Sequence, residues 1–95
     1  MAVRIEWDSR KAAGNLRKHG VSFDEASTVF DDPLAVIFDD EDHSVDEIRE
    51  LIVGYSIRRQ LLIVSFTERE PEIVRIISAR LATRKEIKDY EENNR

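Results

Sequence analysis

The sequence predicts an α+β fold, in which a mostly antiparallel sheet carries two helices from the N-terminal part of the chain and a C-terminal helix. Three observations predict it. Strand-like and helix-like hydrophobic patterns follow one another in the order β-α-α-β-β-β-β-α. Runs of strands bracketed by helices are typical of α+β folds. The 95 residues are 41% hydrophobic, enough for one modest core, so residues 1–95 are expected to form a single domain.

The chain is predicted to begin with a strand and a helix. Residues 3–7 alternate apolar and charged side chains, as a half-buried strand does. Asp8 is placed to cap a helix over residues 9–19, and Gly20 follows its basic last turn, where a C-cap is expected. The stripe of this helix predicted to face the core consists of Ala12, Ala13 and Leu16.

A second helix is predicted directly afterwards. Ser22 and Glu25 have the spacing of a capping box, in which Ser22 accepts from the amide three residues on and Glu25 reaches back. The helix is expected to stop near Pro33, because proline disfavours helix in the residue before it. Its predicted core face consists of Phe23, Ala26, Val29 and Phe30.

Four strands and one helix are predicted for the rest of the chain. The strand segments are 34–38, 47–57, 60–68 and 72–80. An acidic loop over 39–46 separates the first two, and turns near 56–59 and Glu70-Pro71 join the others. Thr83 and Glu86 form a second capping box, which opens a final helix to about residue 92.

Composition excludes several kinds of function. The chain has no cysteine, which excludes disulfides, thiolate metal sites and cysteine nucleophiles, and makes the cytoplasm the expected location. No apolar run approaches the roughly 18 residues of a membrane span, and the N-terminus lacks a signal-peptide core. The three glycines are dispersed, so no glycine-rich phosphate loop is present.

A metal site would have to use histidine and carboxylates. The acidic loop offers such residues, namely Asp39, Asp40, Asp42, His43 and Asp46. Their oxygens suit a divalent cation, but the loop lacks the glycine and the terminal glutamate of a calcium-binding loop. A solvated loop is therefore favoured, and neither a metal nor another cofactor is expected.

The net charge of −5 is distributed very unevenly. Residues 20–50 hold eleven acids and one base, a net charge of −10, whereas residues 57–85 hold seven bases and three acids. One interpretation is a solvated surface of mixed charge. The other is a basic cleft beside an acidic wall, which could receive a basic partner.

The remaining catalytic chemistry is acid–base and electrostatic. Free histidine titrates near ~6.5, so His19 could accept or donate a proton at neutral pH, although it could equally be an ordinary residue at a helix C-terminus. Arginine can hold a phosphate with two parallel donors. Such groups suit metal-free RNA cleavage, in which the ribose 2′-hydroxyl attacks the adjacent phosphate and the protein supplies proton transfer and cations.

Strict alternation along the predicted strands places two candidates at strand ends. Arg80 would end a largely apolar face shared with Val74 and Ile76, at the rim of the sheet. Glu68 would end the face of its own strand in the same way. Arg84 and Lys85 begin the last helix, where a bound phosphate would offset the unfavourable interaction of cations with the helix dipole.

Two blocks of the sequence together form a specific pattern. The first runs from Glu6-Trp7-Asp8 through Lys11, Asn15, Lys18-His19-Gly20-Val21 and Phe23 to Asp32-Pro33. The second contains Leu62-Ile63-Val64-Ser65-Phe66-Thr67 and Arg75-Ile76-Ile77-Ser78-Ala79-Arg80, with Arg49 and Gly54 before it and Glu86 and Tyr90 after it. In this order and at compact spacing, the two blocks resemble the BrnT toxins. The resemblance spans essentially the whole chain.

The resemblance implies a RelE-like fold and a ribonuclease toxin of a type II toxin–antitoxin system that inhibits translation. It implies an RNA substrate and a BrnA-type antitoxin, expected in a 2:2 complex that reaches operator DNA only through the antitoxin. RelE-like toxins place basic residues and a tyrosine of the C-terminal helix over a sheet cleft, without a metal. No membrane association is expected.

The candidate site residues follow from the resemblance and from the placement above. The catalytic candidates are His19, Glu68, Arg80, Arg84 and Tyr90, and the RNA-binding candidates are Lys18, Arg58 and Lys85. His19 or Glu68 would transfer protons, Arg80 and Arg84 would stabilise the pentavalent phosphate, and Tyr90 could instead pack with Ile87. The alternative function is a non-catalytic binding module of a DNA-binding regulatory complex. A structural domain whose charges only confer solubility is a weaker possibility.

Overall fold

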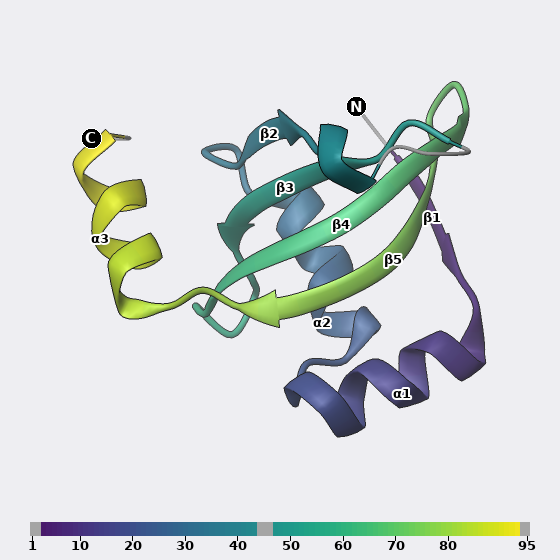
Figure 1. Ribbon diagram of the computed structural model, residues 1–95, viewed down its shortest axis with the longest axis horizontal. Coiled ribbons are helices and arrows are strands. Elements are labelled where there is room, and N and C mark those ends of the chain that lie inside the picture. Colours follow the sequence, from purple (N-terminus) through teal and green to yellow (C-terminus); the bar gives the residue numbers. More distant parts are fainter. Residues whose placement is uncertain (1–2, 44–46, 94–95) are drawn as a thin grey trace.

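The strands of the sheet follow the order β1-β5-β4-β3-β2 (Figure 1). The structure is a computed structural model that describes residues 3–43 and 47–93. Its strands are β1 Arg4–Trp7, β2 Val36–Asp39, β3 Glu50–Tyr55, β4 Leu61–Glu70 and β5 Ile73–Leu81. Its helices are α1 Ser9–His19, α2 Phe23–Ser27 and α3 Arg84–Asn93, with the 3-10 segments η1 Thr28–Asp31 and η2 Glu41–His43. Apart from these two 3-10 segments, the order of elements is the predicted one.

The sheet is mixed rather than purely antiparallel. The strands β2, β3, β4 and β5 pair as antiparallel neighbours, whereas β1 pairs parallel with β5, from Arg4 opposite Ile73 to Trp7 opposite Ile76. The α+β class is confirmed, and the prediction of a mostly antiparallel sheet needs this qualification. A four-residue alternation shows that a strand forms but does not reveal the direction of its partner.

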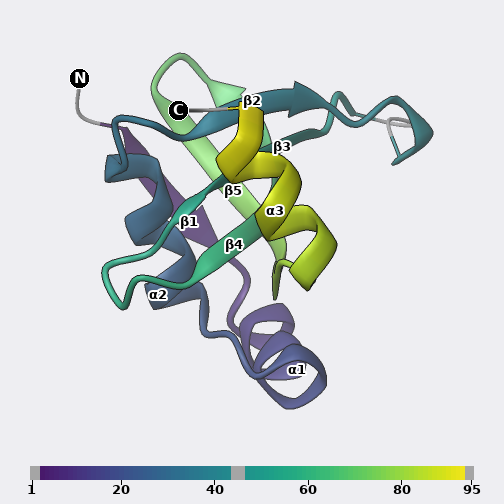
Figure 2. The same ribbon diagram turned by 90° about the vertical axis from the view of Figure 1, so that its left-hand side faces the viewer.

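Helices α1 and α2 contact β5 and each other. In the two ribbon views, α2 lies on one side of the sheet and α3 on the other (Figures 1 and 2). We call the face turned away from α2 the open face. The core between α2 and the sheet consists of Val21, Phe23, Ala26, Val29, Ile52, Leu62, Val64, Phe66, Val74, Ile76 and Ala79.

The predicted caps are present. The Asp8 carboxylate accepts from the amides of Arg10 and Lys11, and these two hydrogen bonds lower the pKa of Asp8. Gly20 ends α1 with φ +70°, a left-handed conformation that favours glycine. At the start of α2, Ser22 Oγ accepts from the Glu25 amide at 3.0 Å, as predicted. The other half of the predicted capping box is wrong, because the Glu25 carboxylate accepts from Ser56 Oγ at 2.7 Å instead of reaching back to Ser22.

The core-facing stripe of α1 differs from the prediction. Ala12 packs against the core, but Ala13 and Leu16 are exposed, so the expected stripe is wrong at two of its three positions. The buried residue of α1 is Asn15. An apolar periodicity cannot identify this position, because the core uses the side chain for hydrogen bonding.

The side chain of Asn15 joins α1 to the free edge of β5. β1 pairs with β5 as far as Ile76. Further along β5, the side chain of Asn15 forms hydrogen bonds with the backbone of Ala79. Asn15 Nδ2 donates to the Ala79 carbonyl at 2.8 Å, and the Ala79 amide donates to Asn15 Oδ1 at 3.1 Å. Asn15 Nδ2 also donates to the carbonyl of Val21 at 2.9 Å. The amide therefore acts like one more residue of a neighbouring strand.

A bulge in β5 changes the face to which Arg80 belongs. Ser65 of β4 is opposite Ser78, but Phe66 is opposite Ile76, so Ile77 is an extra residue. Beyond it, Ala79 joins the core and Arg80 turns to the open face. The predicted placement of Arg80 on the face of Val74 and Ile76 is wrong, because strict alternation does not continue through a bulge.

Two strands begin two or three residues later than predicted, and the starts of β4 and β5 differ by one residue. β2 begins at Val36 rather than Leu34, because Asp32 accepts from the amides of Leu34 and Tyr55 and forms a turn there. β3 begins at Glu50 rather than residue 47. Gly54 of β3 lies close to this turn, where an added Cβ would be 2.8 Å from the Ala35 Cβ, so only glycine fits.

We expect Asn15→Ala to lower the free energy of unfolding by about 2–4 kcal/mol, measured by urea denaturation. The substitution leaves buried backbone groups of Ala79 and Val21 without partners, and each such group costs about 1–3 kcal/mol. Leu16→Ala is the control, because Leu16 is 51% exposed on the same helix and its truncation should cost less than about 1 kcal/mol. Equal losses in the two variants would contradict the role given to Asn15.

Candidate active site

A hollow of about 260 Å³ lies on the open face of the sheet. It contains two arginines, one histidine, one aspartate and two serines around an apolar floor. Its lining residues are His19, Asp40, Arg49, Leu51, Ile63, Ser65, Ser78, Ala79 and Arg80. These residues come from the end of α1, the strands β3, β4 and β5, and the segments next to β2 and β3. We call it the basic hollow.

Two features described above place its main cation and its histidine. The bulge at Ile77 turns Ser78 and Arg80 to the open face. Asn15 and His19 are four residues apart on α1 and so share one side of the helix. Because Asn15 is hydrogen bonded to Ala79, the residue before Arg80, the same contact holds His19 beside the hollow.

The fork of Arg80 is bound by Glu86. Nη1 of Arg80 donates to Glu86 Oε1 at 2.8 Å and Nη2 donates to Oε2 at 3.0 Å. The hydrogen bond from Arg80 is the main cause that lowers the pKa of Glu86 to about 2, followed by that from the Thr83 amide. The same bond raises the pKa of Arg80 above its ordinary value. Arg80 and Glu86 are therefore both charged across the physiological range.

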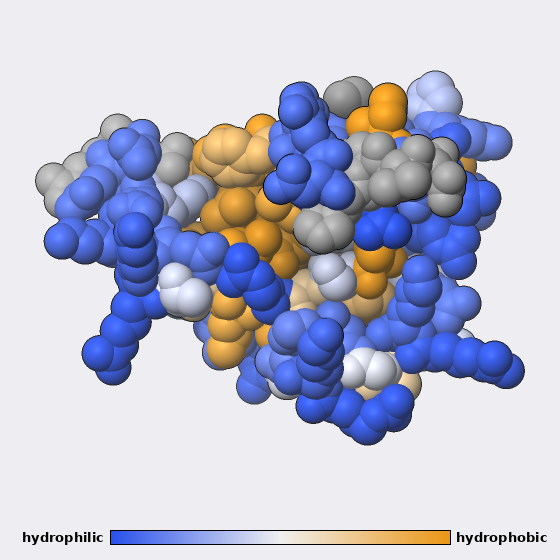
Figure 3. All heavy atoms as spheres, in the orientation of Figure 1, coloured by the Kyte–Doolittle hydropathy of each residue, from blue (hydrophilic) through white to orange (hydrophobic). Residues whose placement is uncertain are grey.

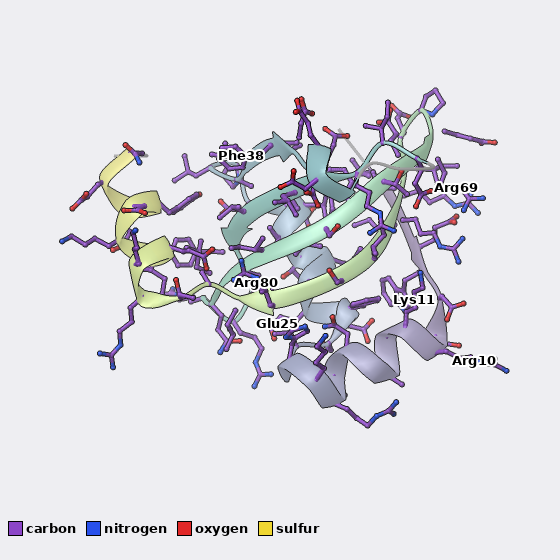
Figure 4. The ribbon with its side chains drawn as sticks, in the orientation of Figure 1. Arg10, Lys11, Glu25, Phe38, Arg69 and Arg80 are labelled. Atoms are coloured by element: carbon purple, nitrogen blue, oxygen red, sulfur yellow. The ribbon has the colours of Figure 1, made fainter. Side chains whose placement is uncertain are left out.

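One edge of Arg80 is left for a ligand. Nη1 also donates to the Leu81 carbonyl at 3.3 Å, so three of the five guanidinium N–H groups have partners. In the part of the chain that the structure describes, the N–H of Nε and one N–H of Nη2 have none. These two donors are parallel, which suits two oxygens of a phosphate. Figure 4 shows Arg80 at the α3 end of β5, well away from Arg10 and Arg69.

Sequence reasoning missed three residues of the site. Arg49 and Asp40 line the basic hollow, and the Asp40 amide donates to the Arg49 carbonyl at 2.9 Å. Arg49 is the single base among the acids of residues 20–50, and this isolation was the available signal. Glu86 was assigned to a capping box and to the family resemblance, but not to the site. It does cap α3, since Thr83 Oγ1 accepts from its amide and Glu86 Oε1 accepts from that of Thr83.

Tyr90 lies in a second hollow of about 470 Å³, which we call the α3 groove. Its lining residues are Val36, Phe38, Val53, Ile63, Glu86, Asp89, Tyr90 and Asn93. The Tyr90 hydroxyl donates to the Leu34 carbonyl at 2.7 Å, and its ring contacts that of Tyr55 edge to face. Burial, followed by the charge of Asp32, raises the pKa of Tyr90. These contacts attach α3 to the sheet and leave Tyr90 outside the basic hollow.

The structure brings together two of the eight predicted site residues, His19 and Arg80. Five others are exposed and line neither hollow, namely Lys18, Arg58, Glu68, Arg84 and Lys85. Glu68 is three residues beyond Ser65, the lining residue of β4 nearest to it, about 10 Å at the rise of a strand. Lys18 is next to His19 on α1, whereas Arg84 and Lys85 are in the first turn of α3.

The acidic loop was the alternative metal site. Asp46 and the side chain of His43 lie outside the described part of the chain. Among the side chains that the structure does describe, no three of histidine, aspartate or glutamate are grouped to hold a metal ion. The chemistry available in the basic hollow is that of two guanidinium groups, an imidazole and a carboxylate. Such a set can bind a phosphodiester and transfer a proton to or from it.

Comparison with known proteins gives a consistent result. The family model described as the ribonuclease toxin BrnT of type II toxin–antitoxin systems matches residues 7–86. The 1.1 Å crystal structure of the Brucella abortus ribonuclease toxin BrnT matches with a TM-score of 0.66 and 24% identity, over 87% of this chain and 100% of that one. At this identity the likeness shows a shared fold. The comparison with curated proteins found no match.

We expect Glu86→Gln to remove a pH-dependent part of the stability. The pKa of Glu86 is lowered from 4.5 to about 2 in the folded protein, so its contribution is complete above pH 4.5 and is lost as the pH falls towards 2. The side chains of Arg80 and Glu86 are 42% and 37% exposed, and solvent screening limits this contribution to about 1 kcal/mol. Urea denaturation between pH 7 and pH 2 measures it.

Asp89→Asn is the matched control, because Asp89 is an exposed acid of the same helix. Glutamine keeps the capping geometry, so the wild-type protein and Glu86→Gln should differ at pH 7 and converge near pH 2. A difference that persists at pH 2 would show that the substitution acts through packing and not through charge.

Proposed function

The chain belongs to the BrnT family of ribonuclease toxins of type II toxin–antitoxin systems, and we propose that it cleaves RNA at the basic hollow without a metal ion. The observation that carries this proposal is the set of groups in that hollow. His19, Arg49 and Arg80 line it together, and they provide a proton-transfer group and two fixed cations. RNA needs no further nucleophile, because its own 2′-hydroxyl is next to the phosphate.

The proposed reaction is a transphosphorylation. His19 takes the proton of the 2′-hydroxyl, whose oxygen forms a bond to the adjacent phosphorus. The bond from phosphorus to the 5′-oxygen breaks, and the imidazolium of His19 returns the proton to that oxygen. The products are a 2′,3′-cyclic phosphate and a 5′-hydroxyl, so atoms and protons balance. The free edge of Arg80 is placed to bind two phosphate oxygens, whose charge increases in the pentavalent transition state.

Binding of Arg80 to Glu86 supports this role. The ion pair fixes the guanidinium through one edge and orients the other edge before substrate arrives, so that little reorganisation is needed in the transition state. Asp40 lines the hollow together with His19, whereas Glu68 does not. We therefore place Asp40, rather than the distant Glu68, beside the proton-transfer group.

The other predicted residues receive roles outside the hollow. We propose that Lys18, next to His19, binds the RNA backbone beside the cleaved bond, and that Arg58, Arg84 and Lys85 act only through long-range attraction. Tyr90 is proposed to hold α3 in place. The RelE-like relationship implied by the resemblance is also part of the proposal, and it is supported by a sheet with α2 on one face and α3 on the other.

Membership of a type II family implies an antitoxin partner. We propose that this partner is of the BrnA type, that it forms a 2:2 complex with the toxin, and that it makes the contact with operator DNA. No helix in the described part of the chain is long and apolar enough to cross a membrane. The cytoplasm is the proposed location of both proteins.

We expect Arg80→Ala to lower the rate of RNA cleavage by about 10²–10³-fold, since removing one transition-state stabiliser commonly has this effect. Arg84→Ala, four residues away and outside the hollow, should change the rate by less than about 3-fold. Cleavage of a labelled RNA under single-turnover conditions measures both, with thermal unfolding as a check that each variant is folded. A larger loss in Arg84→Ala than in Arg80→Ala would move the site to the start of α3.

We expect cleavage to continue in excess EDTA and to give products that end in a 2′,3′-cyclic phosphate, which mass spectrometry identifies. The guanidinium groups supply the positive charge that a metal would otherwise provide. Complete loss of cleavage in EDTA would contradict metal independence and direct attention to the acidic segment 39–46. Intact RNA under all conditions would favour a non-catalytic binding module.

A further inference from the structure

The α3 groove is larger than the basic hollow, and its chemistry is different. Its volume is about 470 Å³, against about 260 Å³. Four aliphatic or aromatic side chains form its floor, namely Val36, Phe38, Val53 and Ile63. Figure 3 shows a continuous apolar surface beside the hydrophilic helix α3. Surfaces of this kind on a small protein commonly mark a site where another molecule binds.

The sheet side of the groove ends at an unprotected strand. β2 is the last strand of the order and, among the described residues, pairs with β3 alone. Phe38 is 51% exposed and Ile37 is 54% exposed, so both faces of this short strand present apolar side chains. An exposed apolar edge strand is prone to association with another chain. A partner that covers β2 would remove this tendency.

Helix α3 forms the other wall and is weakly attached. None of its described residues is buried. Its contacts with the rest of the molecule include the hydrogen bond from Tyr90 to the Leu34 carbonyl, that from Tyr55 to Glu91, and the Arg80–Glu86 pair. A wall held by a few polar contacts can shift to fit an occupant at low cost.

The charge around the groove is negative. Asp89 lines it, as does Glu86, whose charge is paired with that of Arg80, and no lysine or arginine lines it among the described residues. Asp39 ends β2 and is followed by Asp40, Glu41 and Asp42. An apolar floor with an acidic rim favours a segment that presents apolar side chains flanked by lysine or arginine. RNA is a poor occupant, because its phosphates would face these carboxylates.

We propose that the α3 groove is the docking site of the antitoxin, and that the docking segment is an amphipathic stretch with an apolar anchor over Phe38 and basic residues facing Asp89 and the acids after β2. This inference rests on the proposed function, because it concerns how that activity is stopped. The groove and the basic hollow share Ile63, and Glu86 of the groove binds Arg80 of the hollow. An occupant of the groove therefore lies directly beside the bound phosphate and blocks the RNA chain on that side.

The test uses Phe38→Asp in the full-length toxin together with the antitoxin encoded beside it. We expect the affinity for the antitoxin, measured by calorimetry, to fall by about 10²-fold or more, as for a central anchor of an interface. RNA cleavage without antitoxin should stay within about 2-fold of the wild type, and the antitoxin should no longer inhibit it. Leu16→Asp is the matched control, because Leu16 on α1 is equally exposed at 51%.

A second variant tests the charge of the partner. Asp89→Lys should lower the affinity for the antitoxin by about 5–10-fold at low salt and reduce the dependence of that affinity on salt concentration. Stronger binding in Asp89→Lys would show that the partner segment is acidic, and would overturn the proposed complementarity.

Three other results would overturn the proposal. The first is unchanged inhibition of Phe38→Asp by the antitoxin. The second is loss of RNA cleavage in folded Phe38→Asp with antitoxin affinity retained, which would assign the groove to RNA. The third is a wild-type dimer, without antitoxin, that Phe38→Asp converts to a monomer, which would assign the groove to a second copy. If the wild-type protein binds the antitoxin through Phe38 but cleaves no RNA, the proposed function fails and the docking site stands.

Discussion

The hydrogen bonds between Asn15 and the backbone of Ala79 are the constraint on which the rest of the molecule depends. They close the edge of β5 at the point where β1 ends. They also fix α1 against the sheet through a side chain that is 8% exposed. An unpaired amide or carbonyl at this depth would be costly, so the position of α1 along β5 is set by polar geometry and not by hydrophobic contact alone. The distance between His19 and Arg80 follows from that position, since each lies close in sequence to one partner of the contact.

The bulge at Ile77 has an equally large effect on chemistry. A regular strand would leave Arg80 on the core side, where a charged side chain needs a buried partner. One extra residue instead gives Ala79 to the core and Arg80 to the open face. The same strand thus contributes Val74 and Ile76 to the core and Ser78 and Arg80 to the basic hollow. Bulges often re-aim a side chain near active sites, and this one does so with a single residue.

Features that depend on neighbouring residues were predictable from the sequence, whereas features that depend on distant pairing were not. The caps at Asp8, Gly20 and Thr83 involve residues a few positions apart, and the structure contains all three. The order of the elements followed from local periodicity. The parallel pairing of β1 and the burial of Asn15 depend on contacts between residues more than sixty positions apart. The bulge depends on the register between β4 and β5. A single sequence has no local signal for any of these. The candidate site shows the same difference. His19 and Arg80 were predicted from their residue type and their position in the sequence. Asp40 and Arg49 are brought beside them by the pairing of strands in the sheet.

The side chain of Glu86 makes two separate contacts. It completes the cap of α3 with Thr83 and holds the guanidinium of Arg80. Glutamine would keep the first contact and lose the charge of the second, and aspartate would be one methylene short of reaching both. Few replacements are therefore neutral at this position, even though its side chain is partly exposed to solvent. A mutation here would be inherited as a change at the start of α3 and a change beside Arg80 together, so that the helix and the arginine of the basic hollow cannot drift independently.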